Sequence, residues 1–265
     1  MRTRLPALLG VLLWVTPVHA QTAAPVHATY EIYALGLPIA HLRAEFLISS
    51  HDYRIDLSYQ TTGLVGALFR GWQSSNVQGV WNGERPAPLR FSGDGFWRGH
   101  ERHVLIDYQG GAPIIRTLVP PNEEEREPVP PALQVGAIDT LSAMALLIRQ
   151  VERTGRCETE VATYDGRRLA DIVARTGGDE TLRASRWSVY GGTALRCDFE
   201  GRLRAGFLHG QDAATAERPL LGSAWLGQAV PGGPPLPVQL SFETRWFGHA
   251  TMYLTEAGTG NEAKR

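Results

Sequence analysis

The pattern that decides the fold is clearest at residues 53–60, which read Tyr53-Arg54-Ile55-Asp56-Leu57-Ser58-Tyr59-Gln60. Apolar and polar side chains alternate along this stretch, and a period of two is typical of a β-strand with one buried face. The stretch before it alternates in the same way, with four apolar residues on one face: Leu42, Ala44, Phe46 and Ile48. The two segments predict neighbouring strands.

Similar segments recur along the whole chain. They lie at 29–35, 74–81, 103–108, 114–118, 157–164, 168–175, 186–190, 193–199, 238–246 and 250–255. Asp165-Gly166, Gly191-Gly192 and a turn at Gly248 separate three pairs of them, and such residues supply the positive φ that tight hairpins need. The pattern predicts a mostly β fold, an antiparallel meander curled into a barrel or half-barrel.

One segment has a helical period instead. Its apolar residues fall on one stripe of a helix: Leu141, Met144, Ala145, Ile148 and Val151. Asp139 is a good N-cap because its carboxylate accepts from free N–H groups of the first turn. Gly155 is suited to end the helix. We therefore predict one main α-helix at about 139–153, packed on a sheet face or plugging the barrel.

The first twenty residues are typical of a cleavable secretory signal. Arg2 and Arg4 precede a short apolar run, and Val18 and Ala20 put small residues before Gln21. The apolar run is shorter than the roughly 20 residues that a membrane-spanning helix needs. We expect export to a periplasm, cleavage after Ala20, and a mature protein that does not span the membrane.

The composition is that of an ordinary globular protein, with 43% hydrophobic and 20% charged residues. A net charge of −1 gives no excess of positive charge, so a nucleic-acid partner is not expected. We predict a single β-rich domain over 21–258 and a flexible tail at 259–265. The Pro/Glu-rich stretch 120–131 is expected to be a solvated loop inside this domain.

Cys157 and Cys197 are the two cysteines of the chain. A period of two puts Cys157 on the face of Val161 and Cys197 on the face of Leu195 and Phe199. Both sulfurs then point to the apolar side of their strands, and an oxidising compartment favours a disulfide. We predict a Cys157–Cys197 disulfide, with two buried free thiols as the alternative.

Several short motifs together resemble a known family. They are Tyr30 and Tyr33 before Gly36, Ile138-Asp139-Thr140-Leu141-Ser142-Ala143 at the helix start, Cys157 before Tyr164-Asp165-Gly166-Arg167-Arg168, Cys197 after a hairpin, and Pro237-Val238 before the last strands. Over roughly 28–257 the chain resembles the secreted proteobacterial family known as domain of unknown function 3108. Thr140 departs from the Pro usual there, which is favourable but replaceable at the first helical position.

The resemblance implies a periplasmic, mostly antiparallel β protein with no assigned activity, and it supplies no catalytic residues. The chain itself contains no G-x-S-x-G motif. Asp139 and Ser142 could serve as orienter and nucleophile, but a capping role for Asp139 explains them more simply. In a strand, the odd separation of His100 and His103 puts their rings on opposite faces. We therefore expect no catalytic residues, no metal site and no cofactor, and lean toward a protein that is not an enzyme.

The stretch 63–72 is unusually apolar for a connection between strands. It holds the candidate ligand-binding residues Leu64, Leu68, Phe69 and Trp72. Connections this apolar are either buried or cover something apolar, so the stretch is a lid at a barrel mouth or a short helix closing the barrel end. The six tryptophans after the signal have the same two interpretations, because Trp lines apolar cavities and also fills cores.

Three functions are compatible with these features. The leading hypothesis is binding of a lipid or other apolar envelope ligand in the barrel interior, without catalysis. The first alternative is a structural adaptor that pairs with an envelope protein through a sheet edge. The second alternative is a cell-envelope hydrolase, which would show converging polar groups with shifted pKa values.

Overall fold

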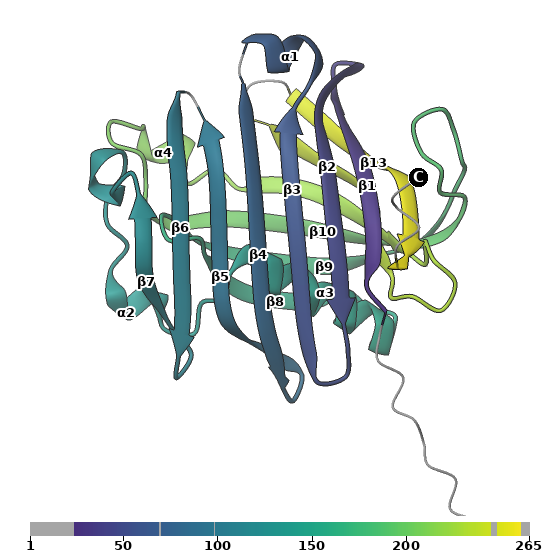
Figure 1. The fold of residues 1–265 in the computed structure, drawn as a ribbon, viewed down its shortest axis with the longest axis horizontal. Helices are drawn as coiled ribbons and strands as arrows, with labels where there is room; N and C mark the ends of the chain where they lie inside the picture. The colour runs from purple at the N-terminus through teal and green to yellow at the C-terminus, as the bar shows by residue number, and fades with distance from the viewer. Residues whose placement is uncertain (1–23, 69, 98, 245–247, 261–265) are drawn as a thin grey trace, which may run out of the picture.

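A single curled sheet forms the molecule (Figure 1). The computed structural model describes residues 24–68, 70–97, 99–244 and 248–260. Within them, 13 antiparallel strands follow the order β7-β6-β5-β4-β3-β2-β1-β13-β12-β11-β10-β9-β8. Each half is a meander, and the pairing of β1 with β13 joins the halves. Because β7 and β8 end the sheet on opposite sides, it is not closed, and the predicted curled antiparallel meander is confirmed.

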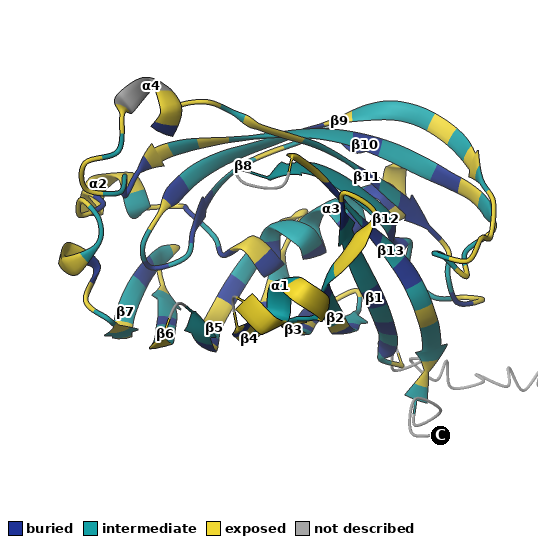
Figure 2. Cartoon of the chain, turned by 90° about the horizontal axis from the view of Figure 1, so that it is seen from above, coloured by how far each residue is buried: buried dark blue, intermediate teal, exposed yellow. Residues whose placement is uncertain are grey.

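The two halves of the sheet face each other as two layers (Figure 2). One layer contains β1 (Val26–Ala34), β2 (Leu37–Ile48), β3 (Asp52–Thr61), β4 (Gly71–Asn82), β5 (Arg85–Trp97), β6 (His100–Gln109) and β7 (Ala112–Val119). The other contains β8 (Thr159–Tyr164), β9 (Leu169–Leu182), β10 (Gly192–Ala205), β11 (Leu220–Gly227), β12 (Leu236–Thr244) and β13 (Gly248–Thr259). The strands of the second layer run across those of the first.

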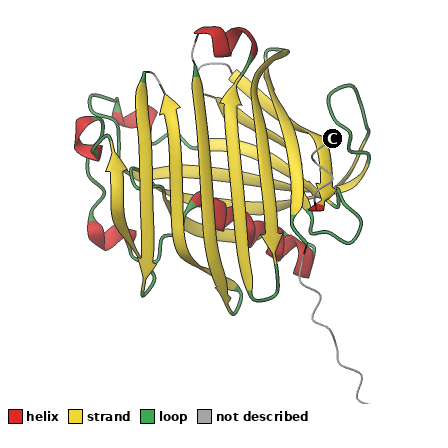
Figure 3. Cartoon of the chain, viewed as in Figure 1, coloured by secondary structure: helices red, strands yellow, loops and turns green. Residues whose placement is uncertain are grey.

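Four α-helices and one 3₁₀ turn connect the described strands (Figure 3). They are α1 (Gly63–Leu68), the 3₁₀ turn Asn122–Glu124, α2 (Pro131–Gln134), α3 (Thr140–Thr154) and α4 (Ala213–Ala216). In the described part of the chain, none of these helices is long and apolar enough to cross a membrane. The predicted signal at residues 1–20 lies outside the described residues.

Helix α3 confirms the predicted main helix. Asp139 is its N-cap, and Gly155 ends it at φ 65° with its N–H bonded to the carbonyl of Val151. The helix contacts β3, β4, β5 and β8. Its apolar stripe is buried, with Ile148 fully inaccessible to solvent. The stripe therefore fills the space between the two layers at the end of the sheet where β3 begins.

Two strands have no counterpart in the sequence prediction, because small residues occupy their interior face. On β5, a Cβ at Gly95 would lie 2.8 Å from the carbonyl oxygen of Trp72. On β11, a Cβ at Gly222 would lie 2.3 Å from the ring of Phe199. Glycine at such positions removes the apolar side chain that alternation requires, so β5 and β11 do not appear as apolar–polar repeats.

The predicted strand at 186–190 is wrong. These residues belong to the connection from β9 to β10. The hydroxyl of Ser185 accepts from the N–H groups of Trp187 and Ser188, at 3.1 and 3.3 Å. A serine that bonds nearby backbone in this way replaces the ladder of a strand with a turn.

The expectation of a solvated loop at 120–131 is also wrong for part of that stretch. Asn122 and Val129 are buried. Glu127 donates its N–H to the carbonyl of Phe207, and His209 donates its N–H to the carbonyl of Glu125. The stretch thus pairs with the segment after β10 and lies against both layers.

The predicted disulfide joins Cys157 and Cys197, with 5.6 Å between their Cα atoms. Both residues are completely buried. Cys157 follows α3 by three residues, and Cys197 lies on β10. The bridge therefore ties the end of the interior helix to the second layer, and its presence indicates an oxidising environment.

Removing this bridge is expected to destabilise the protein strongly. A Cys157→Ala/Cys197→Ala variant should lose about 2–5 kcal/mol of unfolding free energy, because the unfolded chain gains freedom and a buried contact is lost. Urea unfolding of both proteins checks the difference. Thiol titration of the denatured, unreduced parent protein should find no free thiol; two reactive thiols contradict the bridge.

Candidate ligand-binding site

The register of the first layer shows which side chains face the interior. Directly paired residues of neighbouring strands share a face, and one row runs Tyr30, Leu42, Tyr59, Gln73, Gly95 and Arg102. Tyr30 belongs to the buried core. All members of this row, the charged Arg102 included, therefore lie on the interior face.

The interior is filled at the α3 end and accessible at the other. A row toward the α3 end is almost completely buried and contains Phe46, Ile55, Val77, Phe91 and Ile106. The row of Tyr59 described above lies two interior positions farther along the strands. Its side chains are only partly buried: Leu42, Tyr59, Gln73 and Arg102. The interior face is therefore in contact with solvent at this end, which we call the open interior.

The opposite layer contributes further apolar side chains. On the interior face, Phe199 of β10 and Leu240 of β12 pack against the core yet stay partly accessible, and Ile32 of β1 does the same from the first layer. The open end is therefore walled by apolar groups on both sides, with polar groups concentrated on β3, β4 and β6.

The turn between β8 and β9 closes the side of this space. A Cβ at Gly166 would lie 2.9 Å from Val104 of β6 and 3.3 Å from Leu118 of β7. The turn therefore packs directly on the interior face of the first layer, with a left-handed glycine at φ 89° that has no room for a side chain. This contact brings Arg167 and Arg168, which follow Gly166, next to Arg102.

Arg168 projects into the open space. Its guanidinium pairs with Asp165 at 2.6 Å, and 54% of the side chain is accessible to solvent. The Asp165 carboxylate raises the pKa of Arg168, so the guanidinium is charged.

Tyr59 is close enough to Arg168 and Arg102 for the charge of each to act on its hydroxyl. Burial raises the pKa of its hydroxyl, while the charges of Arg168 and Arg102 lower it. The hydroxyl donates to Oε1 of Gln73 at 3.5 Å. Arg102 is itself bound by Glu125 through two hydrogen bonds, and this pairing lowers the pKa of the Glu125 carboxyl.

A second polar group lies at the filled end. Ser142 donates its N–H to Asp139 at 2.8 Å and its hydroxyl to the other carboxylate oxygen at 2.6 Å. Because the single serine hydrogen is used, the hydroxyl of Tyr53 donates to Ser142, at 2.8 Å. Burial raises the pKa of Asp139 to about 6, against the lowering effect of these hydrogen bonds.

This group is structural. Asp139 and Ser142 are both completely inaccessible to solvent, so a substrate cannot reach the serine. The carboxylate serves as the N-cap of α3 and as the acceptor that fixes Ser142 and, through it, Tyr53 of β3. The hydrogen-bond chain therefore holds the first turn of α3 on the first layer.

The buried carboxyl predicts a pH dependence that an amide lacks. Asp139 with a pKa raised above the unfolded value is protonated more readily when folded, so its ionisation costs stability as pH rises from about 4 to 7. Relative to Asp139→Asn, the parent should lose about 3 kcal/mol over this window. Urea unfolding of both proteins at several pH values measures this difference; a constant difference contradicts the shifted pKa.

The predicted ligand-binding residues are distributed between two surfaces. Leu64 and Leu68 lie on α1, at the end of the sheet opposite α3, and are 71% and 77% exposed. Phe69 lies outside the described residues. The predicted short helix is present, and Leu64 and Leu68 are not buried in the interior.

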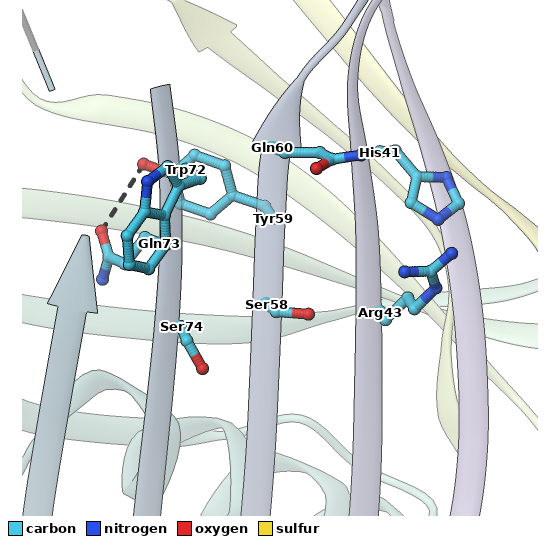
Figure 4. A pocket seen from close by; sticks show the side chains of 8 residues that line it. All are labelled: His41, Arg43, Ser58, Tyr59, Gln60, Trp72, Gln73 and Ser74. Carbon is cyan, nitrogen blue, oxygen red and sulfur yellow. Dashed lines mark hydrogen bonds between the residues drawn. The ribbon is translucent and has the colours of Figure 1, made fainter. Parts of the chain in front are cut away.

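Trp72 faces the outer side of the sheet. Its neighbours Gly71 and Gln73 face the interior, and side chains alternate along β4. Figure 4 shows Trp72 beside a shallow hollow lined by polar groups of β2, β3 and β4: His41, Arg43, Ser58, Gln60 and Ser74. The structure thus separates Trp72 from the leucines with which the sequence grouped it.

Tyr59, Arg102 and Arg168 were not predicted as site residues from the sequence. One signal was available: Tyr59 and Gln73 place polar groups at interior positions of strands that are otherwise apolar there. Arg168 carried no such signal, because a charged residue beside an Asp-Gly turn is ordinarily on the surface.

Most of the sequence matches the model of a known family. The family model described as a protein of unknown function (DUF3108) matches residues 29–255. The chain belongs to this family. The resemblance stated from the motifs is thereby confirmed, and in this DUF3108 protein the motif at 138–143 forms the buried N-terminal turn of α3. None of the curated proteins matches the sequence.

Solved structures share the architecture of this DUF3108 protein at low sequence identity. The crystal structure of a β-barrel-like protein of domain of unknown function DUF1849 from Brucella abortus is 10% identical, with a TM-score of 0.55 over 90% of this chain and 98% of that one. LprF from Mycobacterium bovis is also 10% identical and aligns over 90% of this chain and 87% of that one, with a TM-score of 0.25. The first likeness shows a β-barrel-like fold, and the second carries no argument.

Proposed function

We propose that the protein binds a lipid or other amphipathic ligand inside the curled sheet, without transforming it. The observation that carries the proposal is the change in burial along the interior. At the α3 end the interior face is closed, whereas apolar side chains at the opposite end, such as Leu42 and Phe199, face inward and remain partly accessible. Apolar walls with a few polar groups are typical of sites for apolar ligands.

The compartment forms part of the proposal. A disulfide supports export to an oxidising space, and residues 1–20 have the pattern of a secretory signal cleaved after Ala20. We propose the periplasm as the site of action, where lipids of the envelope are available as ligands.

Helix α1 is proposed as the rim over which an acyl chain enters. Leu64 and Leu68 expose apolar surface at the accessible end, and exposed apolar groups beside a cavity favour contact with apolar ligands. A Leu64→Ser/Leu68→Ser variant should weaken binding of a fluorescent fatty-acid probe and change stability by no more than about 0.5 kcal/mol, because little buried area is lost. Val189→Ser, an exposed apolar residue between β9 and β10, should leave binding unchanged.

Fluorescence quenching locates the acyl chain of the bound ligand within the fold. Trp97 faces the interior, since its ring lies 2.4 Å from the position of a Cβ on Gly71, whereas Trp72 faces outward. Dibromostearate and its methyl ester, which quench nearby tryptophan, should quench the parent protein. Trp97→Phe should lose most of that quenching, and Trp72→Phe should retain it. Absence of quenching by both compounds would sink the proposed function.

A sheet-edge adaptor remains the second candidate because of β7. The other terminal strand, β8, is covered by Ile138, which exchanges hydrogen bonds with Ala162 and Tyr164. In the described chain, β7 pairs along its length with β6 alone. If strand addition is the function, neither bromolipid quenches, and hydrogen exchange at 112–119 slows when envelope extract is added.

A further inference from the structure

Two of the arginines around the open interior have no ion-pair partner among the described residues. Four arginines influence one another there, Arg102, Arg126, Arg167 and Arg168, and two carboxylates, Glu125 and Asp165, lie among them. Arg102 pairs with Glu125 and Arg168 pairs with Asp165. Glu123 acts on Tyr164 together with Asp165 and Arg167, so at least three carboxylates lie among the four arginines. Arg126 and Arg167 form no ion pair with any of them in the described part of the chain.

The two arginines without an ion pair, Arg126 and Arg167, bind backbone carbonyl groups instead. Arg126 donates to the carbonyl of Gly206 at 2.8 Å, and Arg167 donates to the carbonyls of Val119 and Pro120 at 2.7 and 2.8 Å. Neither has a carboxylate partner among the described residues, and Nη1 of Arg167 is buried without a hydrogen-bond partner there. Burial lowers the pKa of both groups, which shows that their charge is held at a cost.

Arg168 is the member of this group that an interior ligand can reach. Its Nε and Nη2 contact Oδ2 of Asp165, at 2.8 and 2.6 Å. The Arg168 side chain is 54% accessible, and its charge acts on the hydroxyl of Tyr59. Tyr59 and Gln73 add a hydroxyl and an amide to the same interior face, beside the apolar Leu42.

We propose that the bound amphiphile carries an anionic headgroup, a carboxylate or a phosphate, which Arg168 holds in the open interior beside Tyr59 and Gln73, with its chain along the apolar wall. This inference rests on the proposed function. Guanidinium donors match carboxylate and phosphate geometry, and the two unpaired charges behind Arg168 attract an anion more strongly in a partly dry interior than in water.

The outer face offers a matched arginine. Arg204 of β10 pairs with Asp171 at 2.7 Å, and 51% of its side chain is exposed, nearly the values for Arg168. It faces outward, because the paired residues Leu203 and Ala170 face the interior. Arg204→Ala therefore removes the same charge and the same kind of ion pair away from the proposed headgroup site.

The test compares dibromostearate with its uncharged methyl ester on the parent protein, Arg168→Ala, Arg168→Lys and Arg204→Ala. We expect Arg168→Ala to weaken binding of the acid about 10- to 100-fold, as when a charge-assisted hydrogen bond is lost. Binding of the ester should not change. Arg168→Lys should retain part of the affinity, and Arg204→Ala should equal the parent.

Folding of the variant is checked by its melting temperature. Asp165 still accepts the N–H groups of Arg167 and Arg168 at 2.9 and 2.7 Å when the side chain is removed, so the turn should persist. Retained binding of the ester by Arg168→Ala gives a second check of folding.

The outcomes separate the two proposals. If acid and ester bind the parent equally, and Arg168→Ala binds the acid as the parent does, the headgroup inference is overturned while lipid binding stands. If neither compound binds, both are overturned. Calorimetry with inorganic phosphate alone tests whether the site binds a free anion. If phosphate binds in a way that depends on Arg168 and dibromostearate does not bind, the proposal of an amphiphilic ligand is overturned, and the site is one for a free anion.

Discussion

The position of α3 between the layers depends on one buried carboxylate. Asp139 binds the first turn of the helix through Ser142, and Ser142 receives the hydroxyl of Tyr53 from the facing strand. Each partner would leave a buried polar group unsatisfied if the helix moved away, and such a group costs on the order of 1–3 kcal/mol. The network thus specifies where the helix lies, while its apolar stripe and the disulfide beyond its end supply further stabilisation.

A filled end and an accessible end follow from this placement. The helix spans one part of a sheet that is wider than the helix, so apolar rows near its stripe are closed and those farther away are not. The sheet itself stays open, because its terminal strands do not pair with each other. The β8–β9 turn closes the side by packing Gly166 on β6 and β7, and the same contact carries Arg168 into the interior.

Arginines on the two faces of the sheet differ in burial and in how their charge is balanced. On the outside, Arg90 and Arg116 share Asp107, with side chains about half exposed, and exposed pairs of this kind contribute little to stability. Inside, Arg126 and Arg167 are partly buried and donate to carbonyl groups, and neither forms an ion pair among the described residues. An interior charge is screened less than a surface charge, and this difference makes the interior group a candidate for recognition.

The sequence by itself determined the strands, the helix and the disulfide, because each depends on local or short-period information. The alternation over 53–60 shows which side of that strand is apolar, and the same period places Cys157 and Cys197 on apolar faces. Asp139 marks the start of the helix through its local capping role. The sequence failed at β5 and β11, where glycine replaces the apolar member of the alternation, and at 186–190, where Ser185 binds the backbone of a turn. Only the tertiary structure decided that Trp72 faces outward and that Arg168 faces the interior. Those placements depend on register and on the contact of Gly166 with strands about 50–60 residues earlier in the chain, and neither leaves a periodic trace in the sequence.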